Sequence, residues 1–184
     1  IMTTHKPIEV QELFGDLEPA EENRKWFVVH TKPRREKKLA QYSLQNKINY
    51  YLPLKDSIRV YQYRKVKFTK PLFSGYVFVK CDSEERRILT ITGHTAYFLP
   101  VPNEEVFTGE LKQIHFGRLK GADYRKAEFL EKGMKVIITS GPFEGLTGVV
   151  EDGKNVKRVI LQVNLLRQAV SISASAKQIK IIKE

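Results

Sequence analysis

The densest cluster of cationic side chains follows the first strand that the sequence predicts. Five lysine and arginine residues stand close together here, and they are Lys32, Arg34, Arg35, Lys37 and Lys38. Such clusters contact nucleic-acid phosphates, and a nearby amide side chain such as that of Gln41 could reach base edges. We therefore expect these six residues to bind DNA. A solvated helix face is the alternative interpretation of the same pattern.

The residue types that usually carry catalysis are scattered along the chain. The four histidines, His5, His30, His94 and His115, lack the spacing of metal ligands. The turn at 141–145 is not followed by the Gly-Lys-Ser/Thr of a phosphate loop, and no pair of carboxylates can be recognised. We therefore expect no enzymatic activity, no metal and no cofactor. The single cysteine, Cys81, excludes an intrachain disulfide and is expected to be a packed thiol.

Aromatic residues gather on a second predicted strand, at residues 75–81 with the sequence GYVFVKC. Its alternation places Tyr76 and Phe78 on one face of the strand. Aromatic side chains suit a docking surface because they bury a large area and lose little rotamer entropy. Phe78 could equally belong to the core, whereas the Tyr76 hydroxyl favours the wet edge of such a surface.

The elements that would position these residues alternate between strands and helices. We expect strands at 26–31, 49–54, 75–81 and 95–101, two short strands joined as a hairpin within 55–70, and helices at 33–46, at 82–91 and after Asn103. This order predicts an α+β fold with a mixed, mostly antiparallel sheet and flanking helices. The hairpin carries a second, weaker cationic patch made of Arg59, Arg64, Lys65 and Lys67.

The stretch at 133–152, GMKVIITSGPFEGLTGVVED, predicts a strand, a tight turn and a second strand. Glycine adopts positive φ without strain, and proline fixes φ at about −65°, so both are typical of such a turn. The pattern resembles the KOW motif of small five-stranded barrels, although Met134 stands where that motif usually has aspartate. The motif residues are Gly133, Gly141, Pro142, Phe143, Gly145 and Gly148. The shape of a barrel corner alone would explain about half of them.

Charge and composition predict the domain organisation. The chain of 184 residues carries 32 basic and 21 acidic residues, and this excess of positive charge favours a polyanionic partner. Residues 1–25 are acidic and are expected to form a mostly disordered extension. We expect an N-terminal domain at 26–118, a linker at 119–131 and a KOW domain at 132–184. The chain shows neither an apolar run of membrane-spanning length nor a secretory signal, so we expect it to be cytoplasmic and away from membranes.

Three segments appear in an order that resembles the NusG family of transcription elongation factors. They are WFVVHTKPRREKKLA, KPLFSGYVFVKCD and KVIITSGPFEGLTGVV, and the resemblance extends over about 26–184. Ser74 stands where the family usually has proline. The exposed loops and the Pro-Leu-Phe lead-in are more similar to the specialised paralogues, the RfaH-like antiterminators of bacterial polysaccharide operons.

The resemblance implies a monomeric, non-catalytic elongation and antitermination factor. Its N-terminal domain would dock on the clamp helices of RNA polymerase, span the cleft, suppress pausing or termination and contact the non-template DNA strand. Its KOW domain would recruit a ribosomal protein or a termination factor. The polymerase contacts implied are Val28, His30, Leu72, Phe73, Tyr76, Phe78, Thr90, Thr92 and Phe98. The core is the alternative location for Phe78 and Phe98, and a ribosome-associated or general RNA-binding KOW protein is the alternative function.

Some specialised relatives convert the barrel into a helical form. Residues 156–170, VKRVILQVNLLRQAV, have mixed propensity in this chain. The Gly-Pro turn and the β-branched residues Val159, Ile160, Val163 and Ile172 favour strands. We therefore expect a stable barrel.

Overall fold

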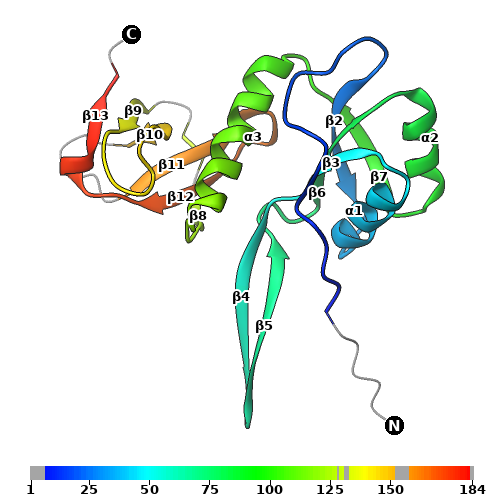
Figure 1. The fold of residues 1–184 in the computed structure, drawn as a ribbon, viewed down its shortest axis with the longest axis horizontal. Helices are drawn as coiled ribbons and strands as arrows, with labels where there is room; N and C mark the ends of the chain where they lie inside the picture. The colour runs from blue at the N-terminus through cyan, green and yellow to red at the C-terminus, as the bar shows by residue number, and fades with distance from the viewer. Residues whose placement is uncertain (1–6, 128, 131–132, 152–157, 183–184) are drawn as a thin grey trace. The chain divides into compact units, whose positions relative to one another are not determined.

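The computed structural model describes residues 7–127, 129–130, 133–151 and 158–182. The chain divides into two compact units, 1–104 and 105–184, and each is built on its own antiparallel sheet (Figure 1). The boundary expected from the sequence lay at 118, whereas helix α3 (Glu104–Leu119) belongs to the second unit in all but its first residue. None of the described helices combines the length and the apolar character needed to cross a membrane.

The first unit contains a five-stranded antiparallel sheet with the order β1-β3-β6-β2-β7. Its strands are β1 (Leu13–Phe14), β2 (Lys25–Thr31), β3 (Asn49–Tyr51), β6 (Tyr76–Cys81) and β7 (Thr95–Pro100). Helices α1 (Glu36–Gln45) and α2 (Ser83–Ile91) contribute Leu39 and Leu89 to the same core as Val77, Val79 and Cys81. This core confirms the α+β fold. Burial, with Glu85 and Asp82 nearby, raises the pKa of Cys81 to about 12, as befits a packed thiol.

Both helices of the first unit begin where the local backbone chemistry permits. Helix α1 starts three residues after Pro33 because Arg34 has a φ of 60°, in the left-handed region. Helix α2 begins with a capping box, as Asp82 and Glu85 each accept a hydrogen bond from the other's backbone N–H.

The segment before β2 packs against the first sheet, so the prediction of disorder is wrong for residues 10–18. Strand β1 pairs with β3 and forms one edge of the sheet, Val10 and Phe14 pack against the core, and Leu17 is buried. The acidic composition was misleading because a few apolar residues at suitable spacing are enough to dock a short segment on an open sheet edge.

Hydrogen bonds fix the same segment to buried polar groups of the sheet. The Tyr50 hydroxyl donates to the Gln11 carbonyl at 2.6 Å, and the Trp26 indole N–H donates to the Glu18 carbonyl at 2.8 Å. Lys80, whose side chain is only 9% exposed, forms an ion pair with Asp16. These partners satisfy groups that would otherwise be buried without one.

Strands β4 (Leu54–Tyr61) and β5 (Arg64–Pro71) form the predicted hairpin. Among the described strands they pair only with each other, and they extend from the five-stranded sheet as a long ribbon (Figure 1). Tyr61 faces Arg64 in the register, which leaves a two-residue turn at the tip.

The second unit contains a six-stranded antiparallel sheet with the order β13-β9-β10-β11-β12-β8. Its strands are β8 (Arg125–Ala127), β9 (Met134–Ile138), β10 (Thr147–Val150), β11 (Arg158–Val163), β12 (Gln168–Ser173) and β13 (Ile179–Ile181). Short 3-10 turns, η1 (Asn164–Leu166) and η2 (Ala176–Gln178), connect the last three strands. Residues 158–173 are therefore mainly strand, in agreement with the expected β structure.

The expected linker at 119–131 contains ordered structure that the sequence reasoning missed. Strand β8 pairs with β12, and Tyr124 just before it is buried and donates to the Ile114 carbonyl at 2.7 Å. The short strand was missed because its sequence, Arg-Lys-Ala, has little β propensity of its own and depends on the neighbouring strand.

The predicted glycine-rich turn joins β9 to β10. The Gly145 N–H donates to the Ile138 carbonyl at 2.8 Å and closes the turn, in which Phe143 is half-buried. Gly141 and Gly145 have φ values of 89° and 87°, so their positive φ explains the residue type. Gly148 is needed for a different reason, because a Cβ there would lie 2.6 Å from the Ile160 carbonyl oxygen.

Candidate functional site

Three aromatic side chains meet on one face of the first sheet, where β2 lies between β6 and β7. His30 pairs in register with Tyr76 on one side and with Tyr97 on the other. Its ring stacks on Tyr97, with centroids 4.8 Å apart, and meets Tyr76 at an edge, with centroids 5.1 Å apart. Tyr97 is 53% exposed, while His30 and Tyr76 are half-buried. We call His30, Tyr76 and Tyr97 the aromatic triad.

A second group of rings surrounds Phe78, two residues after Tyr76 on strand β6. Phe78 contacts Tyr51 and Phe73, with ring centroids 6.3 and 6.1 Å away. Phe78 and Val28 are fully buried and Phe73 nearly so. The core interpretation of Phe78 therefore fits the structure.

Phe98 does not join the other predicted contact residues. Its ring meets Phe27 at an edge, 5.9 Å between centroids, and packs against the core beneath the helices. Successive strand residues point to opposite faces, so the neighbouring Tyr97 occupies the face of His30 and Tyr76. The sequence reasoning missed Tyr97. Because side chains alternate along a strand, only one of Tyr97 and Phe98 can lie on the face of His30. The register of β7 against β2 places Tyr97 there.

The remaining predicted contact residues take part in local hydrogen bonds. The Leu72 N–H donates to the Pro53 carbonyl at the base of the hairpin. The Thr90 hydroxyl donates to the Arg86 carbonyl on the exposed side of α2. The Thr92 hydroxyl donates to the Leu89 carbonyl at the end of the helix.

A tight turn ahead of β6 sets the position of Tyr76. Gly75 has a φ of 87°, its N–H donates to the buried Glu36 carboxylate at 2.7 Å, and its carbonyl accepts from the Thr31 N–H at 2.8 Å. Helix α1 and strand β2 therefore hold both ends of this turn. Ser74, which departs from the family pattern, is exposed in it and does not prevent it from forming.

The cationic cluster forms a patch around a histidine that the sequence reasoning did not include. The Lys32 N–H donates to the His94 carbonyl at 2.9 Å, which joins the turn after β2 to the loop before β7. Burial lowers the pKa of His94, and the positive charges of Arg35, Lys38 and Lys32 lower it further. We call these four residues the cationic patch. Arg34 and Gln41 are exposed in the same turn and helix.

Lys37 differs from the other predicted DNA contacts because its ammonium group is used inside the unit. It donates to the Ile8 carbonyl at 2.9 Å and to the Thr69 hydroxyl at 2.8 Å. Burial lowers the pKa of this ammonium, and Glu9 nearby opposes the shift. Lys37 therefore connects the N-terminal segment to the hairpin.

The lowered pKa of His94 predicts how the stability of the first unit depends on pH. Below the ordinary histidine pKa of 6.5, the unfolded chain takes up a proton that the folded state resists. The contribution of His94 is thus complete above that pH and is lost as the pH falls through the folded-state pKa. We expect the His94→Gln variant to lose less stability than the wild type between about pH 7 and pH 5, measured by urea unfolding followed through Trp26 fluorescence. An identical pH dependence would contradict this prediction.

A family model and several known proteins are similar to this chain. Residues 24–108 match the family model described as "Transcription termination factor nusG". A protein named "Transcription termination/antitermination protein NusG" from Rickettsia felis is 26% identical over 186 residues, which cover 92% of this chain and 97% of the relative. The protein of the same name from Rickettsia bellii is 25% identical over 173 residues, covering 86% and 90%.

A solved structure of Thermotoga maritima NusG also matches, with a TM-score of 0.44 and 22% identity, over 87% of this chain and 98% of that one. Residues 24–108 match the NusG family model and the relatives match over most of the chain, in agreement with the resemblance seen in the sequence. The matching family and relatives are named for transcription termination or antitermination, in agreement with the expectation of no enzymatic activity. Within the part of the chain that the structure describes, no group of three or more potential ligands could hold a metal ion.

Proposed function

We propose that this chain is a transcription elongation and antitermination factor that binds RNA polymerase across its cleft and suppresses pausing or termination. The observation that carries the proposal is the NusG-type first unit, whose sheet presents an aromatic triad. The names of the relatives, which refer to transcription termination and antitermination, support the same process.

The triad is suited to a protein contact because its rings are fixed before binding. His30 is held between Tyr76 and Tyr97, so little rotamer entropy remains to be lost when a partner covers it. The His30 Nδ1 atom is buried and has no hydrogen-bond partner among the described residues. A partner on this face, proposed as the clamp helices of RNA polymerase, would cover the exposed part of Tyr97 in an apolar contact with a polar margin.

The cationic patch supports a contact with DNA. Lys32, Arg35 and Lys38 place three positive charges around His94, whose protonation would add a fourth. Such a patch fits the phosphates of the non-template strand, with Arg34 and Gln41 exposed beside it. Phosphate binding would favour the charged form of His94 and oppose the effect of its cationic neighbours.

We propose that the second unit is a KOW domain and that it recruits a further partner. Its β9–β10 turn presents Pro142 and Glu144 as exposed side chains beside the half-buried Phe143. A ribosomal protein or a termination factor is the proposed partner. The proposal extends to a specialised, monomeric and cytoplasmic factor of the antiterminator type.

The experiment that tests the proposal is retention of purified bacterial RNA polymerase by the immobilised full chain. We expect wild-type protein to retain the enzyme, and the Tyr76→Ala/Tyr97→Ala variant to bind it at least about tenfold more weakly, as for a contact hot spot. The matched control is Phe116→Ala, which removes an aromatic ring that is 37% exposed in the second unit.

The outcomes separate the alternatives. Equal retention by the triad variant and the control would place the contact elsewhere in the chain. Failure of the wild type to retain polymerase, together with binding to ribosomes or to RNA, would favour the ribosome-associated or general RNA-binding function instead.

A further inference from the structure

One face of the β4–β5 hairpin combines cations and aromatic rings without any carboxylate. Residues paired across the two strands share a face, and four successive non-adjacent pairs define this one. They are Lys55 with Lys70, Ser57 with Phe68, Arg59 with Val66, and Tyr61 with Arg64. We call Lys55, Arg59, Tyr61, Arg64, Phe68 and Lys70 the cation–aromatic face.

The charged groups of this face lie against its rings. The Arg59 guanidinium carbon is 5.8 Å from the centroid of Phe68, and the Lys70 ammonium nitrogen is 5.3 Å from the same centroid. The Arg64 guanidinium carbon is 5.8 Å from the centroid of Tyr61. These contacts order the long side chains along the ribbon, so their positive charges form a row.

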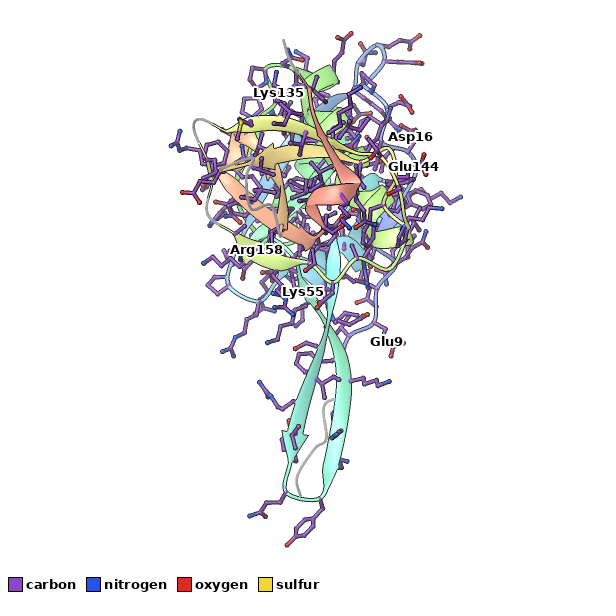
Figure 2. The ribbon with its side chains drawn as sticks, turned by 90° about the vertical axis from the view of Figure 1, so that its left-hand side faces the viewer. Glu9, Asp16, Lys55, Lys135, Glu144 and Arg158 are labelled. Atoms are coloured by element: carbon purple, nitrogen blue, oxygen red, sulfur yellow. The ribbon has the colours of Figure 1, made fainter. Side chains whose placement is uncertain are left out.

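Folding alone does not explain this arrangement. Lys55 and Lys70 are directly opposed like charges, which destabilise a strand pair, and an isolated two-stranded ribbon is only marginally stable in water. Tyr63 at the tip is 96% exposed, so none of the described residues buries its ring. Figure 2 shows Lys55 where the ribbon leaves the sheet, and the side chains beyond it stand clear of the first unit's sheet.

The opposite face of the hairpin differs in its surroundings. Near the base, Asp56, Ile58, Lys67 and Thr69 of this face line a groove with residues 7–10, which Ser57 and Phe68 also border. There the Thr69 hydroxyl accepts a hydrogen bond from Lys37. Figure 2 shows Glu9 beside this part of the ribbon. Asp56 lies on this face, together with Lys65 and Lys67. The face opposite the cation–aromatic face thus has a structural role at the base of the ribbon. It also carries Asp56, the acidic residue of the hairpin.

We propose that the hairpin binds single-stranded nucleic acid on its cation–aromatic face. Lys55, Arg59, Arg64 and Lys70 contact successive phosphates, while unstacked bases stack on Tyr61 and on the exposed ring of Tyr63. Stacking requires bases that are free of a duplex, and it tolerates different base identities. The ligand is therefore a single strand, DNA or RNA, bound with little sequence preference. This inference does not depend on polymerase docking and concerns a surface separate from the cationic patch.

The test measures binding of the full chain to fluorescein-labelled oligomers by fluorescence anisotropy. The probes are oligo(dT), oligo(U) and a DNA duplex, each about 12 nucleotides or base pairs long, within the span of known single-strand sites. We expect the Tyr61→Ser/Tyr63→Ser variant to bind single strands about tenfold more weakly than the wild type, and the Tyr61→Phe/Tyr63→Phe variant to retain binding because its rings remain. Comparison of the oligo(dT) and oligo(U) affinities identifies which single strand is preferred.

A second pair of variants separates the face from overall charge. Arg59→Gln/Lys70→Gln and Lys65→Gln/Lys67→Gln each remove two positive charges, but from opposite faces of the ribbon. We expect the first pair to weaken binding and to lower the slope of log affinity against log salt by about 1.4, while the second leaves the slope nearly unchanged.

Several results would overturn the proposal. Equal weakening by the two charge variants would assign binding to net charge rather than to the face. Unchanged binding in all hairpin variants would assign it to another surface, and tighter binding of the duplex than of either single strand would exclude base stacking. The assay contains no polymerase, so each of these results leaves the proposed function to be judged separately.

Discussion

Replacing Phe14 and Leu17 by alanine is expected to lower the free energy of unfolding of the first unit by about 4 kcal/mol. Leu17 is buried and Phe14 packs against the core, although both belong to a segment whose composition suggests disorder. The loss would also release Glu18, whose carbonyl accepts the hydrogen bond from the Trp26 indole. The double substitution thus removes apolar packing and also frees the carbonyl that accepts the hydrogen bond from the buried Trp26 side chain.

The chain contains one tryptophan, and Trp26 lies in the first unit, so guanidinium unfolding followed by its fluorescence reports on this unit alone. The control is Glu21→Ala, a substitution at an exposed position of the same segment. A midpoint equal to that of the control would show that residues 10–18 contribute nothing to the stability of the sheet.

The Gly148→Ala substitution is expected to destabilise the second unit by about 1–3 kcal/mol, because the added methyl group would overpack the contact between β10 and β11. The new Cβ would lie 2.6 Å from the Ile160 carbonyl oxygen and 2.5 Å from a methyl group of Val159. Strand β10 pairs with β11 at this point, so the backbone oxygen cannot move without loosening the sheet. The measurement is thermal unfolding by circular dichroism, with amide NMR spectra to locate the change.

Two controls accompany this substitution. Gly109→Ala lies in helix α3 of the same unit, where a Cβ has no heavy atom within 4 Å, and it should stabilise the helix slightly. The Trp26 transition of the first unit should stay at its wild-type midpoint in both variants. Equal stabilities for the Gly148 and Gly109 variants would refute the close approach of the two strands.

Local patterns in the sequence predicted most elements of the fold. The alternation at residues 76–81 and the capping residues Asp82 and Glu85 depend on near neighbours in the chain, and both appear as expected. Strand β8 and the docked segment at residues 10–18 depend instead on strands distant in sequence, β12 and β3. Their own composition carries no comparable signal, which explains why both were missed.

The candidate site shows the same division between local and distant information. The alternation of a strongly predicted strand selected Tyr76, whereas His30 was expected from the family resemblance. Choosing Tyr97 over Phe98 required the register of β7 against β2, which includes an irregularity between His30 and Thr31. The position of Lys37 against Ile8 and Thr69, and that of His94 within the cationic patch, likewise follow only from tertiary structure.

The most direct test of the central claim is the lifetime of a defined transcriptional pause, measured with purified bacterial RNA polymerase in single-round reactions. We expect the wild-type protein to shorten the pause and the Tyr76→Ala/Tyr97→Ala variant, at the same concentration, to leave it unchanged. The Phe116→Ala control should act like the wild type. A pause lifetime that the wild type leaves unchanged, or that the triad variant shortens equally, would contradict the claim that this chain acts on elongation through the aromatic triad.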